Sequence, residues 1–265
     1  MSLQAPNNYK QHKTQKPRNT ETFKLRNGVS HRTAKPSTKL NLETTLVMIY
    51  KEWIKTRWFY AVALLTTFAL CGYVLLNINR LVSLKGAAHL WEVAMFRDAI
   101  FIDMLRYIPL LVGIVAAVVQ FVPELVHKRL KLTMHLPRGY VRSVMEMLLF
   151  GFGCLALLFC GNLVMLLFGL QIFFADEIVW HIVLTALPWY LAGLSAYILV
   201  AWICLEPVWR RRILNILISI ACLRVFYMSP APEAYNRLLP WLTLLVVVSL
   251  ALPLLSVVRF KEGKE

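Results

Sequence analysis

Long apolar blocks separated by short polar segments make up most of the chain. Each block has ~20 residues, the length that crosses a bilayer core of ~30 Å as an α-helix. The fifth block is the shortest and contains Arg224. We therefore expect an all-α integral membrane protein with a six-helix transmembrane domain over residues 58–260. The six blocks lie at 58–76, 101–122, 144–168, 178–204, 211–228 and 238–258.

Two segments of different character precede the first block. Residues 1–40 are rich in Lys, Arg, Asn, Thr, Gln and Pro, a composition that cannot bury enough apolar surface to offset the entropy of ordering. They predict a disordered basic cytoplasmic tail. Residues 41–57 carry apolar side chains on one helical face and charges elsewhere, which predicts an amphipathic elbow helix in the headgroup plane. Its apolar face would consist of Leu42, Leu46, Ile49, Tyr50, Trp53 and Ile54.

The formal net charge of +15, from 29 Lys and Arg against 14 Asp and Glu, admits two interpretations. Basic chains bind nucleic acid, but basic residues also collect on the cytoplasmic side of membrane proteins. With both termini in the cytoplasm, the inside segments hold 23 of the 29 basic residues and the outside loops hold 4. Without residues 1–40 the ratio is still 14 to 4. The charge therefore follows the cytoplasmic face, where it meets anionic membrane lipids, and no nucleic acid partner is needed.

The loop at 123–143, between the second and third blocks, is the most informative polar segment. It reads PELVHKRLKLTMHLPRGYVRS. Pro123 suits the first turn of a helix, and Glu124 suits the positive end of the helix dipole. Pro137 would end this short helix. Its charged face would consist of Lys128, Arg129 and Lys131, and its apolar contacts would include Leu132 and Leu136.

The segment PELVHKRLKLTMHLPRGYVRSVMEMLLF resembles the loop after the second helix of type 2 ABC transporter permeases. The elbow helix, the six spans and a short second inside loop agree with that family. The resemblance implies that the loop at 123–143 forms a coupling helix that docks on a separate ATPase chain, with a second contact at Glu206, Arg210 and Arg211. One departure is the outside segment 229–237, which leaves little room for the helical hairpin that many members carry.

The resemblance further implies a half-size permease subunit, most simply an exporter of the bacterial inner membrane. Such a subunit pairs with itself or with a sister permease, and with two ATPase chains. The sequence has no GxxxxGK[ST] phosphate-binding loop, so ATP and Mg²⁺ would be bound by the partner ATPase and no cofactor by this chain, which is not expected to be an enzyme. Apolar spans with few central charges favour an amphipathic or lipid-linked cargo. A plain basic loop, as positive-inside bias produces, is the alternative interpretation of residues 123–143.

Ionisable residues inside the apolar blocks are costly in lipid, and each calls for a partner or a function. Asp103 and Arg106, three residues apart, can pair on one helix face. The same holds for Arg142 and Glu146, which are four residues apart. Arg224 lies near an outer end and can extend to water. Interhelical hydrogen bonds are expected from two uncharged side chains, Gln120 and Asn162.

Two other classes of function stay open. A non-transport membrane scaffold or assembly subunit of a larger complex would share the same topology. An intramembrane enzyme has less support, because the chain contains neither an HExxH nor a GxSxG motif. The histidines are scattered without metal-ligand spacing. The five cysteines all lie in apolar blocks, where they are expected to be small buried hydrophobes.

Overall fold

A computed structural model describes residues 38–86, 102–126, 140–229 and 231–262. The described residues form helices joined by short turns, and none of them lies in a strand, as the sequence predicts. The chain divides into two units, Met1–Asn41 and Leu42–Glu265, and the long apolar stretches all lie in the second. The predicted disorder of the basic tail falls almost entirely outside the described residues.

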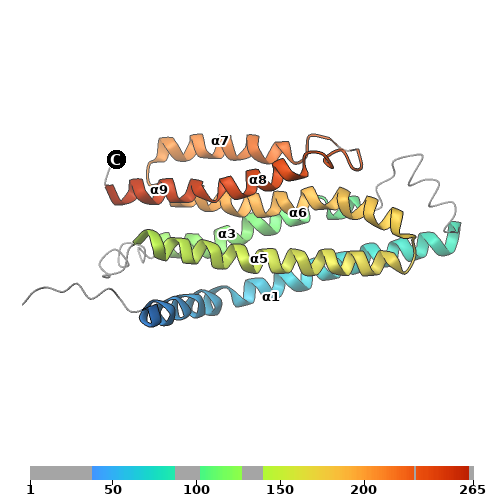
Figure 1. The fold of residues 1–265 in the computed structure, drawn as a ribbon, viewed down its shortest axis with the longest axis horizontal. Coiled ribbons are helices and arrows are strands. Elements are labelled where there is room, and N and C mark those ends of the chain that lie inside the picture. The colour runs from blue at the N-terminus through green and yellow to red at the C-terminus, as the bar shows by residue number, and fades with distance from the viewer. Residues whose placement is uncertain (1–37, 87–101, 127–139, 230, 263–265) are drawn as a thin grey trace, which may run out of the picture. The chain divides into compact units, whose positions relative to one another are not determined.

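The helices follow the predicted apolar blocks closely (Figure 1). The last predicted span is divided into two consecutive helices, since the hydrogen-bonding pattern changes at Leu250. A short 3₁₀ turn, Asp103–Leu105, precedes the second long helix. The helices are α1 (Thr38–Lys85), α3 (Ile108–Val126), α5 (Tyr140–Gln171), α6 (Asp176–Leu205), α7 (Trp209–Val225), α8 (Leu239–Ser249) and α9 (Ala251–Glu262).

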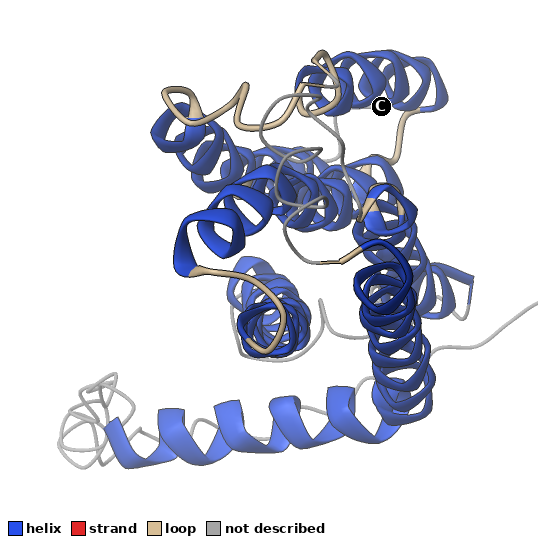
Figure 2. Cartoon of the chain, turned by 90° about the vertical axis from the view of Figure 1, so that its right-hand side faces the viewer, coloured by secondary structure: helices blue, strands red, loops and turns tan. Residues whose placement is uncertain are grey.

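α1 differs from the prediction of an elbow helix followed by a separate first span. It is one continuous helix of 48 residues, and Figure 2 shows that it is bent, so that its first part runs across the direction of the other helices. It also extends beyond the predicted end at residue 76, because no Pro or Gly interrupts residues 77–85. Gly86 ends it with a φ of 79°, a left-handed conformation that glycine adopts readily at a helix C-terminus.

α6 is the central helix, and it packs against α3, α5, α7, α8 and α9. Two glycines lie where α6 crosses α3. A Cβ atom added to Gly113 of α3 would overlap the carbonyl oxygen of Gly193 of α6. Small residues at such crossings let helix backbones approach closely, which is the usual way that membrane helices pack in the absence of a hydrophobic driving force between them.

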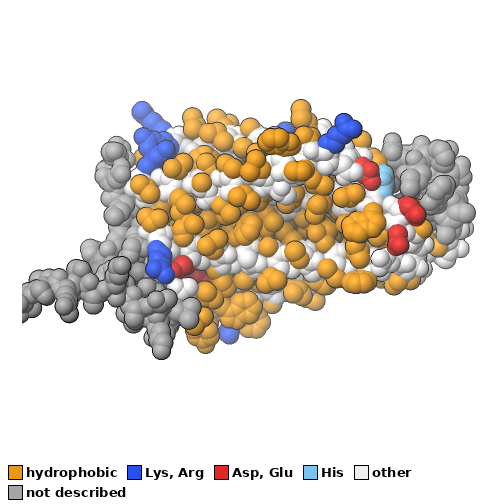
Figure 3. All heavy atoms as spheres, in the orientation of Figure 1, with side chains coloured by type: hydrophobic (Ala, Val, Ile, Leu, Met, Phe, Trp, Pro, Cys, Tyr) orange, Lys and Arg blue, Asp and Glu red, His pale blue; other side chains and the backbone are white. Residues whose placement is uncertain are grey.

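Five described stretches are long and apolar enough to cross a membrane. Hydrophobic side chains cover the middle of the face seen in Figure 3, whereas most charged side chains lie toward its two ends. Both observations confirm an integral membrane protein. α7 was predicted to be a span but is not among these five stretches, because it has only 17 residues and four of them are arginines. The five stretches are Thr45–Leu84, Asp103–Val126, Val141–Gln171, Asp176–Leu205 and Leu239–Arg259.

Candidate functional site

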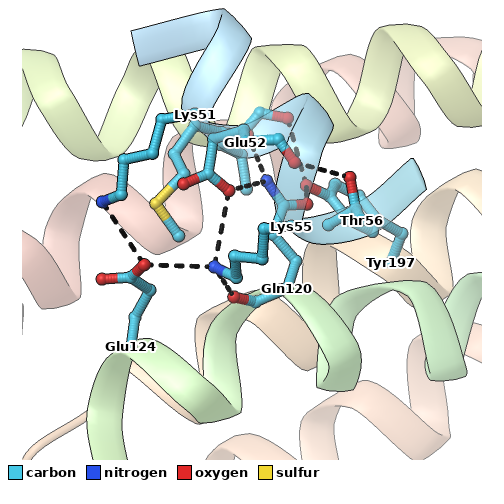
Figure 4. Close-up of polar contacts among 9 residues, drawn as sticks. Lys51, Glu52, Lys55, Thr56, Gln120, Glu124 and Tyr197 are labelled. Atoms are coloured by element: carbon cyan, nitrogen blue, oxygen red, sulfur yellow. Dashed lines mark hydrogen bonds and ion pairs between the residues drawn. The ribbon is translucent and has the colours of Figure 1, made fainter. Parts of the chain in front are cut away.

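One end of the helical unit is rich in basic side chains, and we call it the basic end. It is the end at which α3 and α6 finish and α5 and α7 begin. Polar and charged side chains from three helices meet there beneath the first part of α1 (Figure 4). We call them the charge cluster: Lys51, Glu52 and Lys55 of α1, Gln120 and Glu124 of α3, and Tyr197 of α6.

The first part of α1 turns its polar face inward. Glu52 is 2% exposed and Thr56 is 1% exposed, whereas Tyr50 is 66% and Trp53 is 47% exposed. The apolar side chains predicted for one face are thus exposed and the polar Glu52 and Thr56 are buried, whereas an elbow helix in the headgroup plane stays a prediction. This separation is the arrangement expected of a helix in an apolar medium, where lipid solvates the apolar face and the polar face must find partners inside the protein.

Ion pairs attach α1 to the last turn of α3. The Lys55 ammonium lies 3.2 Å from Glu124 Oε1 and 3.5 Å from Glu52 Oε2. It also donates a hydrogen bond of 2.6 Å to the backbone carbonyl of Gln120. The Lys51 ammonium lies 3.5 Å from the same Glu124 oxygen. Two lysines thus face two glutamates, and this balance is what keeps buried charges from being strongly unfavourable.

Gln120 extends the charge cluster to two more helices. Its side-chain amide donates to the carbonyl of Met147 in α5 at 2.8 Å and to Glu52 Oε2 at 3.4 Å. Its amide oxygen accepts a 2.8 Å hydrogen bond from the Tyr197 hydroxyl. A Cβ atom added to Gly151 would overlap both the Gln120 and Tyr197 side chains, so α5 contacts the cluster through a residue that lacks a side chain. Four helices are therefore connected at one point.

The charge cluster joins helices through buried hydrogen bonds and ion pairs. The described residues contain no group of His, Cys, Asp and Glu side chains that could hold a metal ion. The carboxylates of the cluster are engaged by lysines and Gln120, although Glu52 Oε1 accepts no hydrogen bond from the described residues. A buried network that joins four helices is suited to transmit movement between them, because displacing one member leaves charges without partners.

The position of Glu124 in the structure differs from its predicted position. The sequence suggested that Pro123 starts a new helix and that Glu124, at its N-terminus, faces a partner protein. Both residues instead lie in the last turn of α3, and Glu124 is only 3% exposed. The physical reason is the pair of lysines on α1, which compensate the carboxylate from the side where it is buried. The other predicted coupling residues, Lys128, Arg129, Lys131, Leu132, Leu136 and Pro137, lie outside the described residues.

The second inside loop is partly internal. Glu206 is 1% exposed, and its carboxylate accepts a short hydrogen bond from the Ser256 hydroxyl of α9. Arg259, also in α9, lies 4.0 Å from the same carboxylate. Glu206 thus fastens the α6–α7 connection to α9, which corrects its expected role in contacting a partner. Arg210 and Arg211 are exposed and accessible.

Two of the predicted pairs form as expected from their spacing. Arg106 lies 3.8 Å from Asp103, and its guanidinium also sits over the rings of Tyr107 and Tyr227. Arg142 donates to Glu146 Oε1 at 3.0 Å, and Thr45 donates to the same oxygen. The expected interhelical hydrogen bond of Asn162 is confirmed, since Tyr190 donates to it at 2.8 Å. Arg224 is an exposed residue in the last turn of α7.

The sequence did not predict contacts between residues that are far apart in the chain. Glu52 and Tyr197 were not predicted to belong to a site, because each is simply a polar residue in apolar or basic surroundings. At the opposite end, His181 of α6 lies 2.9 Å from Glu233, a residue whose φ of 54° places it in the left-handed region. A lone carboxylate inside the basic segment at 51–57 was the available clue to Glu52, because such a residue near lipid needs a cationic partner.

Comparison with known protein families, with curated proteins and with solved structures finds no match to this chain. Its function is therefore inferred from its own residues and geometry, together with the resemblance in the loop at 123–143.

Proposed function

We propose that this chain is the membrane-spanning permease subunit of a type 2 ABC transporter, working as an exporter. The single observation that best supports this is the position of Glu124. Glu124 lies near the start of the predicted coupling segment, the loop at 123–143, and it is ion-paired to both lysines of the bent first part of α1. A push on the coupling segment would therefore act directly on α1 and, through Gln120, on α5 and α6.

In this proposal the partner ATPase binds ATP and Mg²⁺, and closure of its two copies moves the coupling segment. The helices tied together by the charge cluster then rock as a rigid group around a central path, as in alternating access. The first part of α1 lies in the headgroup plane with its apolar face toward lipid. Two such subunits, identical or related, enclose the path, in the inner membrane of a bacterium. The cargo class that suits the apolar spans is amphipathic or lipid-linked.

The proposal includes α7 as a sixth span, which places both termini on the cytoplasmic side. α7 buries Asn215 and Ser219, whereas Leu217 and Ile220 are 63% and 60% exposed. Apolar side chains outside and polar ones inside are the pattern of a helix in lipid. Its 17 residues extend ~25 Å, and the arginines at both ends can reach the two interfaces with their long side chains.

The topology can be tested with single cysteines in a chain whose five native cysteines are replaced by alanine. Pro207→Cys should react with a membrane-impermeant maleimide only from the cytoplasmic side, and Met228→Cys only from the outside. Both positions are exposed, and they flank α7. Gly86→Cys serves as an outside reference. Labelling of Pro207→Cys and Met228→Cys from the same side would show that α7 does not cross the membrane.

Coupling is tested by purifying the tagged full-length chain from its native membranes and identifying any ATPase that accompanies it. Replacing Lys128, Arg129 and Lys131 by glutamine should weaken ATPase binding about tenfold, because three charges at a partly wet interface contribute ~1–2 kcal/mol together. ATP hydrolysis by the complex in lipid should fall accordingly. The control replaces Lys10, Lys13 and Lys16, which removes the same charge from the tail, and should change neither measurement.

The outcomes separate a permease subunit from a scaffold or assembly subunit. If no ATPase accompanies the wild-type chain, the permease assignment fails and a scaffold or assembly subunit takes its place. If an ATPase binds but the loop variant matches the tail variant, the chain is a transporter subunit whose coupling contact lies elsewhere.

A further inference from the structure

A groove runs along α1 and α5 beside the charge cluster. It consists of two adjoining hollows of about 430 Å³ and 330 Å³, which share Trp53, Tyr60 and Leu64 as lining residues. The first hollow also includes Arg57, whereas the second reaches Gly161 of α5. We call these together the α1–α5 groove. Both volumes lie in the ~300–1,000 Å³ range of small-molecule sites.

The groove has the length and polarity of one lipid leaflet. Its lining is apolar or aromatic apart from Arg57 at one end, and Phe68 lines the far end. Arg57 and Phe68 are separated on α1 by at most ~16 Å along a helix, about half of the ~30 Å hydrocarbon core. A single acyl chain entering beside Arg57 would therefore reach the middle of the membrane.

Arg57 carries a positive charge that is not balanced by an ion pair with any residue that the structure describes. Lys51 and Lys55 are paired with Glu52 and Glu124 in the charge cluster. Within the described part of the chain, Arg57 has no ion pair, and its guanidinium lies 5.7 Å from the centre of the Trp58 ring. A cation beside an aromatic ring at the mouth of an apolar groove complements a phosphate group with an acyl chain attached.

We propose that the α1–α5 groove binds one anionic glycerophospholipid from the leaflet at the basic end. Its phosphate lies at Arg57, and one acyl chain lies between Tyr60, Leu64 and Gly161. Such a lipid fills the space between the bent part of α1 and α5 and holds α1 in position beside the charge cluster. This proposal does not depend on the permease function, because it concerns a resident lipid and not a transported one.

Native mass spectrometry of the full-length chain in detergent tests the charge requirement. The probes are phosphatidylglycerol and phosphatidylcholine with identical acyl chains. The wild type should retain one phosphatidylglycerol more tightly than phosphatidylcholine. Arg57→Gln should weaken phosphatidylglycerol retention about fivefold, as expected for one basic residue at an anionic headgroup, and should weaken phosphatidylcholine retention much less, because the choline group offsets the charge of its phosphate. Arg80→Gln, an exposed arginine at the other end of α1, is the control and should match the wild type.

A second pair of variants tests the groove itself. Leu64→Trp fills the groove and should abolish the tightly held lipid. Leu65→Trp, at the next position, is 70% exposed outside the groove and should retain it. Leu157→Trp fills the groove from α5. The Leu157 side chain is 76% exposed, so a larger side chain is tolerated there. This variant is used in place of Leu64→Trp if Leu64→Trp does not fold. Equal retention of the two lipids by the wild type, or no difference between Leu64→Trp and Leu65→Trp, would overturn the proposal.

Discussion

Replacing Glu124 with alanine should lower the free energy of unfolding by about 3–5 kcal/mol, the cost of removing one partner from a buried ion pair. Lys51 would then lose its ion pair with Glu124, and Lys55 would keep Glu52 as its remaining ion-pair partner among the described residues. The measurement is titration with sodium dodecyl sulfate in mixed micelles, followed by tryptophan fluorescence. Asp103→Ala is the control, because its carboxylate is 66% exposed and 3.8 Å from Arg106. Exposed ion pairs contribute ~0–1 kcal/mol, so Asp103→Ala should lower the free energy of unfolding very little.

A double variant separates the loss of charge balance from the loss of packing. Lys51→Met combined with Glu124→Leu removes one lysine and one glutamate together and leaves Lys55 beside Glu52 at 3.5 Å. Replacing both members of a buried pair by apolar residues is often close to neutral, so the double variant should recover a large part of the stability lost in Glu124→Ala. If Glu124→Ala and Asp103→Ala destabilise the chain equally, the charge cluster does not hold α1 against α3.

Replacing Gly113 with alanine should destabilise the chain by ~1–3 kcal/mol or more, the usual cost of overfilling a packed core. The new methyl group would overlap the Gly193 carbonyl, which belongs to the backbone of α6 and cannot move aside like a flexible side chain. Alanine also favours a helix over glycine by ~1 kcal/mol, so the clash must outweigh that gain. The measurement is again the free energy of unfolding in mixed micelles.

Gly153 supplies the control for this prediction. It lies in α5, and a Cβ atom added there meets nothing within 4 Å. Gly153→Ala should therefore stabilise the chain by up to ~1 kcal/mol through helix propensity alone. The two alanine variants should thus move stability in opposite directions. Equal stability of Gly113→Ala and Gly153→Ala would mean that α3 and α6 do not approach closely at Gly113.

The α3–α6 crossing at Gly113 and the charge cluster hold the helices together by different physical means. The crossing of α3 and α6 depends on shape, because small residues let dispersion contacts form along two backbones. The attachment of α1 depends on charge, because its inward face is polar and its apolar face is exposed. A helix held by ion pairs at one end can shift when those pairs are disturbed, which is the property that the proposed transport cycle requires of α1.

Local patterns along the chain predict the helices well. Block length and hydropathy are enough to predict an all-helical membrane protein, and helical spacing predicts the amphipathic start of α1. Pairs three or four residues apart, such as Asp103 with Arg106, follow from helix geometry because such residues share one face. The clearest local error is the end of the first span, which the pattern predicts at residue 76, although no Pro or Gly interrupts the helix before Gly86.

The partners of the charge cluster became evident only from the tertiary structure. Lys55 and Glu124 are 69 positions apart, and Ser256 and Glu206 are 50 apart. Helical periodicity shows which face of a helix a side chain occupies, but it does not show which neighbouring helix lies opposite that face. That depends on how the helices pack, and here the end of α3 lies beneath the lysines of α1, as Figure 4 shows. The charge that appeared to point toward a partner protein is therefore held inside this chain.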